Sequence, residues 1–366
     1  MASAFTLSIY PWVYYAQYQD DGSWQESYIE KPHQTPQQED ALSEDERSRL
    51  VAQRNSFAEL PLVNYTTQYG LGCFEGLKAF PQADGSLKLF RPQENGQRMQ
   101  RSMEGLMMPG YPARMFSAAV REVVARNYRL GFYPRYQPEW EKDGFLSATS
   151  VYIRPFSYAE PGIGLNLSRK PWVVVVTTPV GSYFDSELPA KAITTDKARA
   201  TRGGTGWIKC DANYVTPILV KKQMEAEGYM EAIFLDAKEQ KYVEEGSSCN
   251  IFFLLKNGTL VTPQLADTIL PGINRKSILT LARDKGVKTE ERDITIDEAM
   301  DQAAEVFVTG TAAGVAYLES ITHQGRSALF NNGAVGELTW DLLLTLKGIQ
   351  YGSLEDRHGW MVPVAE

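Results

Sequence analysis

An unbroken apolar run of strand length lies near the middle of this chain and limits the folds open to it. Trp172 and the four valines that follow it, ending at Val176, predict a strand that is buried on both faces. Further apolar runs at 232–235, 251–255 and 306–308 predict other strands, and helix-like segments separate them. This mixed order predicts α/β or α+β domains and excludes a repeat solenoid.

Helices are predicted in three main places. Helical periodicity dominates from 98 to about 129. A threonine–proline pair at 216–217 supplies an N-cap and a first-turn proline for a helix that ends near Gly228. A third helix begins after the Pro-Gly pair at 271–272 and runs through Arg283.

The N-terminal part of the chain gives weaker signals. Residues 17–54 are polar and acid-rich, which predicts a surface excursion with one short helix from Ser43. Strand and turn signals follow, and an Asp-Gly pair at 84–85 predicts a hairpin before the strand at 87–90.

The length of the chain predicts two domains. Its 366 residues suffice for two domains with substantial cores. A break in the pattern at 179–190 is the candidate connection between them. We therefore expect a small N-terminal domain at 1–178 and a large domain at 191–366.

Composition excludes several classes of protein. The formal net charge of -8 argues against a general nucleic-acid binder. The three cysteines and three histidines form neither a metal-ligand spacing nor a disulfide framework, which suits a reducing compartment. No signal peptide is visible, and no apolar run approaches the ~20 residues that span a bilayer. We expect a cytoplasmic protein without a metal, a membrane anchor or a nucleic-acid partner.

A glycine-rich turn at 203–206 precedes Lys209, and Tyr214 follows five residues after the lysine. Glycine allows a close approach of the backbone to a ligand, and a lysine held there can form a Schiff base with a carbonyl cofactor. A nucleotide phosphate loop is a second interpretation, although no Ser or Thr follows the lysine in the required frame. A plain surface lysine is the third.

Six further segments stand in a fixed order around this lysine turn. They are 74–80, 98–102, 152–155, 242–253, 270–275 and 309–313. Together the seven segments resemble the branched-chain amino acid aminotransferases, which are fold-type IV enzymes that use pyridoxal 5'-phosphate (PLP). The resemblance runs from about Val63 to Trp360. It implies a mixed α/β fold of two domains, the N-terminal one smaller, with the PLP site between them.

The resemblance assigns the chemistry to a few residues. Lys209 matches the Schiff-base lysine, which also shuttles the proton between substrate and cofactor. Glu245 matches the carboxylate beside the pyridine nitrogen, and Tyr214 matches the tyrosine on the cofactor's phenolic oxygen. Glu244 points elsewhere if the segment is extended, because side chains alternate along a strand.

The phosphate of the cofactor has its own set of matches. Arg98 is one, and the backbone amides of Ile273 and Asn274 at a helix start are the others. Thr311 matches a further phosphate or carboxylate contact, and Arg199 matches a position near the cofactor.

Substrate recognition is implied by a second set of residues. Tyr152 and Arg154 lie on one face of a predicted strand, as in family members that act on L-branched-chain amino acids. The other matches in the pocket are Phe74, Tyr183, Thr311 and Ala312. Positions that reach in from a partner subunit, and so imply a homodimer, match Tyr69, Ile163 and Leu165.

The implied reaction is transamination between L-leucine, L-isoleucine or L-valine and 2-oxoglutarate, giving branched-chain 2-oxo acids and L-glutamate. Alternatives within the same fold are a D-amino acid or (R)-amine transaminase and a lyase of the aminodeoxychorismate type. Tyr152 with Arg154 disfavours both. A PLP-binding protein without turnover and a nucleotide-binding module are alternatives from other classes, and the full set of Lys209, Tyr214, Glu245 and Arg98 argues against them.

Overall fold

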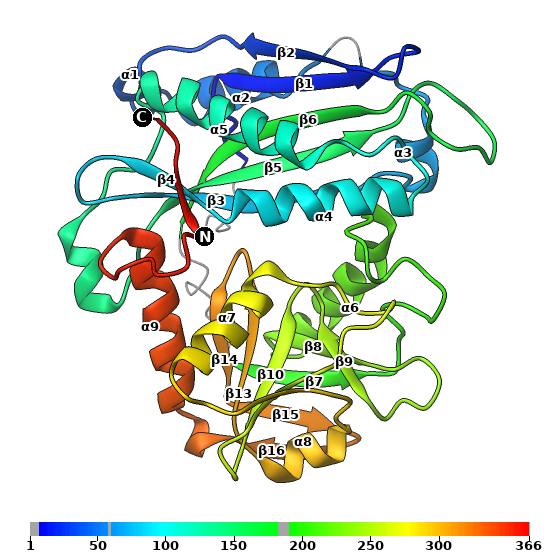
Figure 1. Cartoon of the computed structure of the whole chain (residues 1–366), viewed down its shortest axis with the longest axis vertical. Coiled ribbons are helices and arrows are strands. Elements are labelled where there is room, and N and C mark those ends of the chain that lie inside the picture. The colour runs from blue at the N-terminus through cyan, green and yellow to red at the C-terminus, as the bar shows by residue number, and fades with distance from the viewer. Residues whose placement is uncertain (1–6, 58–59, 182–189, 366) are drawn as a thin grey trace. The chain divides into compact units, whose positions relative to one another are not determined.

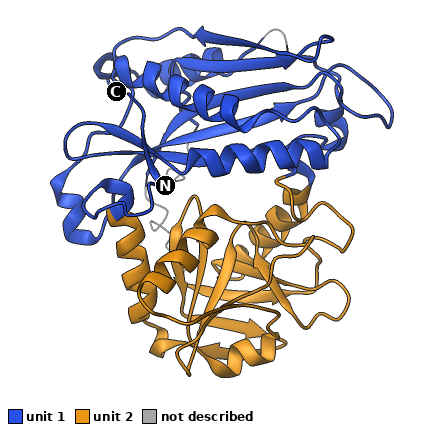
Figure 2. Cartoon of the chain, in the orientation of Figure 1, with its two compact units in different colours: residues 1–182, 210–212, 349–366 blue, residues 183–209, 213–348 orange. Residues whose placement is uncertain are grey.

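The computed structural model describes residues 7–57, 60–181 and 190–365 (Figure 1). Its contacts divide the chain into two compact units (Figure 2). Unit 1 comprises 1–182, 210–212 and 349–366, and unit 2 comprises 183–209 and 213–348. Unit 1 thus contains the C-terminal segment of the chain as well as its N-terminal part.

The predicted connection at 179–190 begins inside a strand. The strand β6 (Trp172–Val180) continues through the first two residues of that segment, and 182–189 lie outside the described residues. The domain limits 1–178 and 191–366 stay a prediction.

Unit 1 is built on a seven-stranded sheet in which every neighbouring pair is antiparallel. In order across the sheet the strands are β17 (Met361–Pro363), β4 (Leu87–Phe90), β3 (Leu77–Pro81), β5 (Ser150–Tyr158), β6 (Trp172–Val180), β1 (Trp12–Tyr18) and β2 (Trp24–Glu30). The apolar run that begins at Trp172 thus forms an internal strand, as predicted. The predicted hairpin joins β3 to β4, with Gly85 at a φ of 82° that favours glycine.

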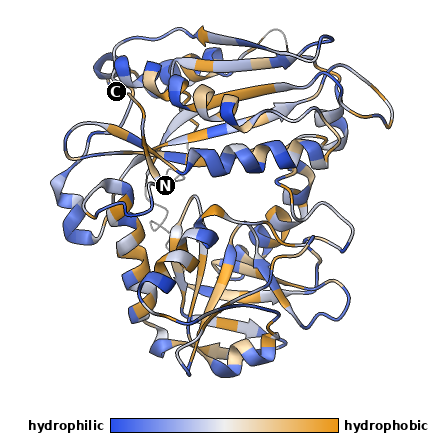
Figure 3. Ribbon diagram, viewed as in Figure 1, coloured by the Kyte–Doolittle hydropathy of each residue, from blue (hydrophilic) through white to orange (hydrophobic). Residues whose placement is uncertain are grey.

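The predicted helical stretch at 98–129 is two helices. They are α4 (Pro92–Gly105) and α5 (Ala113–Arg129). Prolines at 109 and 112 and a left-handed Met107 (φ 56°) interrupt the periodicity between them. α5 packs on β1 and β6, and both helices carry hydrophobic and hydrophilic stretches (Figure 3). The unit also contains two shorter helices, α3 (Tyr65–Tyr69) and η1 (Pro138–Asp143).

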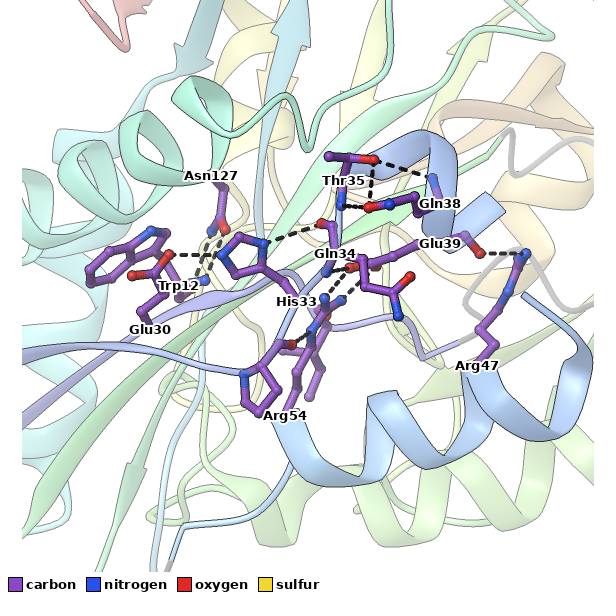
Figure 4. A network of polar contacts seen from close by, with 12 residues as sticks. Trp12, Glu30, His33, Gln34, Thr35, Gln38, Glu39, Arg47, Arg54 and Asn127 are labelled. Atoms are coloured by element: carbon purple, nitrogen blue, oxygen red, sulfur yellow. Dashed lines mark hydrogen bonds and ion pairs between the residues drawn. The ribbon is translucent and has the colours of Figure 1, made fainter. Parts of the chain in front are cut away.

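The polar segment at 17–54 is more ordered than a surface excursion. It contributes β2, α1 (Pro36–Asp40) and α2 (Glu44–Arg54), the last capped by Ser43 as predicted. Arg54 is only 3% exposed and donates to the carboxylate of Glu39 and to the carbonyl of Pro32 (Figure 4). The prediction missed β2 because it is an edge strand whose side chains are mostly exposed, so it lacks an apolar pattern.

Unit 2 contains two five-stranded sheets. The first has the order β12 (Thr289–Glu291), β11 (Leu260–Thr262), β10 (Asn250–Leu255), β13 (Ala303–Gly310) and β14 (Gly314–Leu318). The second has the order β16 (Arg326–Leu329), β15 (Ser320–His323), β7 (Lys191–Thr195), β8 (Glu231–Leu235) and β9 (Val243–Gly246). Buried aliphatic and phenylalanine side chains from both sheets form one core, which includes Ile233, Phe253 and Val308.

The helices of unit 2 flank these sheets. They are η2 (Asp211–Tyr214, the first half of which is in unit 1), α6 (Val215–Ala226), α7 (Ile273–Asp284), α8 (Ile296–Gln302), η3 (Asn331–Gly333) and α9 (Glu337–Tyr351, which ends in unit 1). The N-cap of α6 is Tyr214, not Thr216 as predicted, because the turn η2 leads directly into the helix. α7 begins directly after the Pro-Gly pair, as predicted. Among the described helices, none is both long and apolar enough to cross a membrane.

Candidate active site

Lys209 lies at the end of the glycine turn in unit 2 and is partly buried. Its Nζ donates to the hydroxyl oxygen of Tyr214 over 2.6 Å. Gly206 allows this turn to pack closely, since a Cβ there would lie 2.6 Å from the Cα of Thr268. The amine is therefore held at one place by a phenol, as a nucleophilic lysine requires.

Glu245, on β9, is a buried carboxylate with a complete set of donors. Arg199 donates from Nε to its Oε1 over 2.5 Å, and the Leu270 N–H donates to the same oxygen over 3.2 Å. The Asn250 side-chain amide donates to Oε2 over 3.2 Å. Burial raises the pKa of the Glu245 carboxyl, and the Arg199 guanidinium acts against that shift. We call Lys209, Tyr214, Glu245, Arg199 and Asn250 the lysine cluster.

Glu244, the neighbouring acid, is also buried and not a solvated residue, with 8% of its surface exposed. Burial raises the pKa of its carboxyl to about 7, and the nearby Glu245 raises it further. Its Oε2 has no hydrogen-bond partner in the described part of the chain. Of the two acids, Glu245 is thus the one that has an arginine as its hydrogen-bonded counter-ion.

The first turn of α7 offers backbone N–H groups. Its N-cap is Gly272, which supplies no side-chain cap. A Cβ at Gly272 would lie 2.0 Å from Oδ1 of Asn250, so the helix start is fitted against the lysine cluster. Asn274 donates from its side chain to the Gly310 carbonyl over 2.8 Å, which ties the helix start to the turn that holds Thr311 and Ala312. Such a helix start can bind an anion through Ile273 and Asn274.

A second group of predicted residues lies in unit 1. Arg154 donates from Nη2 to the Tyr152 hydroxyl over 2.7 Å, and its guanidinium stands 4.7 Å from the centre of the Phe74 ring. Tyr152 and Arg154 therefore share one face of β5, as predicted. Gly76 makes room for the tyrosine, since a Cβ there would lie 2.3 Å from the Tyr152 hydroxyl. We call Phe74, Tyr152 and Arg154 the Tyr152–Arg154 face.

Arg98, also in unit 1, is 5% exposed and forms an ion pair that the sequence did not predict. Its Nε and Nη2 donate to the two oxygens of Glu75 over 2.7 and 2.9 Å. Asn95 donates to Glu75 as well, over 2.7 Å. The pair fixes the direction of the guanidinium; its contact with a phosphate stays a prediction.

The residues predicted to act from a partner subunit lie on the surface of unit 1. Ile163 and Leu165 are 79% and 93% exposed, and Tyr69 is 45% exposed. The Tyr69 hydroxyl accepts from the N–H of Gly164, which joins α3 to this loop. Tyr183, predicted to line the substrate pocket, lies outside the described residues.

Two residues in or near these groups were not among the site residues predicted from the sequence. Asn250 donates to both Glu245 and the Leu270 carbonyl, a role that the family resemblance did not assign to it. Asp211 lies in the three-residue segment of unit 1 that follows Lys209, and a charged residue so close to the lysine could have been noted. Within the described ranges, no three His, Cys, Asp or Glu side chains gather as metal ligands would.

Comparison with known families gives one match that covers most of the chain. The family described as "Amino-transferase class IV" matches residues 72–321. This range begins at the Phe74 segment and includes every residue of the lysine cluster.

Two curated relatives extend the match. A "Probable branched-chain-amino-acid aminotransferase" of Staphylococcus aureus (strain MRSA252) is 38% identical over 305 residues, which are 81% of this chain and 81% of the relative. "Branched-chain amino acid aminotransferase 2, chloroplastic" of Humulus lupulus is 38% identical over 81% of this chain and 70% of its own length.

Solved structures agree. The branched-chain aminotransferase of the archaeon Thermoproteus uzoniensis with norvaline has a TM-score of 0.70 and 29% identity, covering 84% of this chain and 95% of that one. The T.th. branched-chain amino acid aminotransferase, complexed with N-(5'-phosphopyridoxyl)-L-glutamate, has a TM-score of 0.68 and 28% identity, covering 84% and 94%.

Proposed function

This chain belongs to the class IV aminotransferase family, and from that premise we propose that it moves an amino group between L-leucine, L-isoleucine or L-valine and 2-oxoglutarate. The products are branched-chain 2-oxo acids and L-glutamate. The family resemblance and the mixed α/β fold inferred from the sequence are confirmed by the match. The observation that carries the proposal is the Lys209 amine held by Tyr214 in the same unit as the buried Glu245–Arg199 pair.

The proposed cofactor is PLP, and the donor set of unit 2 fits it. Lys209 would bond its carbonyl carbon, Tyr214 its phenolic oxygen and Glu245 its ring nitrogen. The N–H groups of Ile273 and Asn274 would hold its phosphate, since the α7 start has no side-chain cap. The phosphopyridoxyl adduct in the T.th. structure supports this choice. When bound, PLP supplies an electron-accepting ring beside Cα of the amino acid.

The lysine cluster supplies the proton chemistry. Once the incoming amine has displaced it from the cofactor, a neutral Lys209 amine would take the proton from Cα of the substrate and carry it to C4′ of the cofactor. The Tyr214 hydroxyl keeps that amine in place. Glu245 holds a proton at the ring nitrogen, which requires the carboxylate form that Arg199 favours. Both tasks need fixed geometry, and the buried hydrogen bonds of the cluster provide it.

The Tyr152–Arg154 face supplies substrate recognition. Phe74 offers an apolar surface for a branched side chain, and the guanidinium with the tyrosine hydroxyl can bind the distal carboxylate of glutamate or 2-oxoglutarate. Thr311 and Ala312 are proposed to contact the other end of the substrate. The norvaline bound by the Thermoproteus uzoniensis enzyme and the glutamate adduct of the T.th. enzyme represent the two substrate classes.

A homodimer is proposed as the working assembly. Ile163 and Leu165 are strongly exposed apolar side chains, and a hydrogen bond from Gly164 to Tyr69 brings that residue to the same loop, so these residues form a candidate interface. Burial against a second copy would remove them from water and would complete the substrate pocket. Size-exclusion chromatography with light scattering should give twice the mass of one chain, and a monomer that transaminates would refute this part.

The cytoplasm is the proposed location. In the described part of the chain no cysteine is part of a disulfide, and Cys73 and Cys210 are buried thiols. Thiols without bridges suit a reducing compartment.

The test is the absorption spectrum of the purified protein with PLP. We expect a visible band from lysine-bound PLP that L-leucine bleaches and 2-oxoglutarate restores. D-alanine in a parallel cuvette should leave the band unchanged. Bleaching by D-alanine alone would keep Lys209 but refute the substrate assignment, and the absence of any band would refute the cofactor.

A further inference from the structure

Asp211 is held in a fixed place on unit 1. The residue before it, Cys210, pairs with Cys73 through an antiparallel β-bridge of the backbone. The Asp211 N–H donates to the Gly72 carbonyl over 2.9 Å. A Cβ at Gly72 would lie 2.4 Å from Oδ2 of Asp211, so only glycine leaves room for this carboxyl group. The aspartate side chain therefore lies against the Gly72 backbone.

Arg154 is the opposite charge that acts on this carboxyl. Its guanidinium stands 4.7 Å from the centre of the Phe74 ring, and Phe74 is only two residues along the chain from the Gly72 against which Asp211 lies. The attraction of Arg154 lowers the pKa of Asp211, but burial outweighs it and raises the pKa to about 6. Two other titratable groups lie in the segment that follows Gly72, to which Asp211 is hydrogen-bonded. Cys73 is a neutral thiol because burial raises its pKa, and Glu75 is compensated by Arg98. The charge that Asp211 responds to is thus that of Arg154.

The guanidinium of Arg154 is nevertheless not fully paired among the described residues. Nη2 donates to Tyr152, while Nε is buried and has no partner among the described residues. No described carboxylate lies within ion-pair distance of its guanidinium; Asp211 acts on it from further away. This differs from Arg199, whose Nε is used by Glu245.

We propose that Asp211 sets the selectivity of the enzyme between dicarboxylate and apolar substrates, by placing a negative charge near Arg154 without occupying its hydrogen-bond donors. The inference rests on the proposed function, in which Arg154 binds the distal carboxylate. A dicarboxylate then gains the arginine but is repelled by Asp211, whereas a branched apolar side chain carries no charge to repel. The aspartate acts as an element of selectivity against one substrate class.

Replacement of the charge is the first test. Asp211→Asn keeps the shape of the side chain, and in the PLP-loaded enzyme it should lower the KM for 2-oxoglutarate about fivefold, as expected for a partly exposed charge pair. The KM for 4-methyl-2-oxopentanoate, the apolar partner, should not change. Glutarate, which cannot react, should bind about fivefold more tightly to the variant in calorimetry. Asp45→Asn, an exposed position on α2, is the control for the same change in net charge.

The wild-type enzyme offers a second test that needs no variant. As pH falls from 8 to 6, Asp211 becomes half protonated, while the carboxylates of 2-oxoglutarate stay ionised. The ratio of the KM for 2-oxoglutarate to that for 4-methyl-2-oxopentanoate should therefore fall about threefold. Asp211→Asn should remove this pH dependence.

A double variant separates the effect from a general loss of structure. In an Arg154→Gln background, Asp211→Asn should have a much smaller effect on glutarate binding, because the arginine that holds the distal carboxylate near Asp211 is gone. Weaker or unchanged glutarate binding in the single variant, or a KM ratio that does not vary with pH, would overturn the inference. Wild-type protein that fails to transfer amino groups from L-leucine to 2-oxoglutarate would instead overturn the proposed function.

Discussion

The lysine cluster of unit 2 and the Tyr152–Arg154 face of unit 1 handle their charges in different ways. In the lysine cluster, Glu245 is 3% exposed and both of its oxygens accept hydrogen bonds, with arginine as the counter-ion. On the Tyr152–Arg154 face, the arginine is only half-buried, and its Nε lacks a partner in the described part of the chain. The buried charge of the lysine cluster thus has its hydrogen-bond partners, whereas the guanidinium of the Tyr152–Arg154 face has an unpaired donor among the described residues.

This difference matches the two tasks of the proposed reaction. The proton steps are the same for every substrate, so the groups that perform them can be fixed in advance by buried bonds. Recognition must alternate between an apolar side chain and a carboxylate, so an arginine fully paired within the protein would disfavour one of the two. The incomplete pairing of Arg154 is therefore expected, and substitutions in the lysine cluster and on the Tyr152–Arg154 face should have different effects.

The largest effect is expected for Lys209→Ala. The variant removes the only group placed to move the Cα proton in the proposed mechanism, so turnover should fall at least ~1,000-fold. Steady-state kinetics with L-leucine and 2-oxoglutarate check this, with circular dichroism to show that the fold remains. Lys197→Ala, an exposed lysine of the same unit, is the control. Normal turnover by Lys209→Ala would remove the lysine from the mechanism.

Glu245→Gln should cost both stability and activity. The substitution leaves the largely buried Arg199 without its carboxylate, and breaking such a pair typically costs about 3–5 kcal/mol. Loss of the charge at the ring nitrogen should also lower kcat about 100-fold. Thermal unfolding and kinetics on the same sample measure the two effects.

Glu244→Gln is the matched control, because it changes the adjacent acid and leaves the Arg199–Glu245 pair intact. If both variants lose activity equally, the two acids do not differ as the hydrogen bonds indicate.

Substitution of one glycine in each region tests how tightly that region is packed. Gly272→Ala has an acceptable backbone (φ -68°) but directs a Cβ at Asn250, and overpacking of this kind costs about 1–3 kcal/mol. Gly76→Ala meets only the hydroxyl end of Tyr152, so we expect a smaller loss of stability and a higher KM for 2-oxoglutarate. Melting temperatures of the PLP-loaded variants and the two KM values measure this.

Two further variants act as controls for the glycine pair. Gly181→Ala places its Cβ more than 4 Å from the other described residues, its chain neighbours aside, and should change neither quantity. Adding Tyr152→Phe to Gly76→Ala removes the hydroxyl that clashes most closely, and this double variant should melt at a higher temperature than Gly76→Ala alone. Equal destabilisation by Gly272→Ala and Gly76→Ala would contradict the contrast between a rigid and an adaptable region.

The sequence predicted the features that local chemistry determines. The strand that begins at Trp172, the helix after Gly272 and the hairpin at Gly85 each follow from an apolar run or a turn residue within a few positions. The family resemblance then predicted which residues gather in each region, and Tyr152 with Arg154 on one strand face agrees with it.

Features that depend on distant partners were not predictable. The strand β2 is polar and gains its place only by pairing with β1. Arg98 carries no local sign that Glu75, 23 positions away, is its counter-ion. Asp211 is placed by a backbone β-bridge between residues 73 and 210, and no periodicity in the sequence predicts that pairing. In each case the energy comes from a contact made only after the chain has folded.

The smallest effect is expected from Glu244, and it depends on pH. Burial raises the pKa of this carboxyl from an ordinary 4.5 to about 7, so between these values the folded protein binds a proton that the unfolded chain releases. The free energy of unfolding must then decrease as pH rises through this window, and the loss is complete above it. Glu244→Gln abolishes the titration, so at pH 8 the variant should be more stable than the wild type by roughly 1–2 kcal/mol, with the difference vanishing near pH 4.5. Denaturant unfolding at both pH values measures it. A difference that does not vary with pH would mean that Glu244 is ionised in the folded state, and that its charge, like that of Glu245, is compensated within the protein.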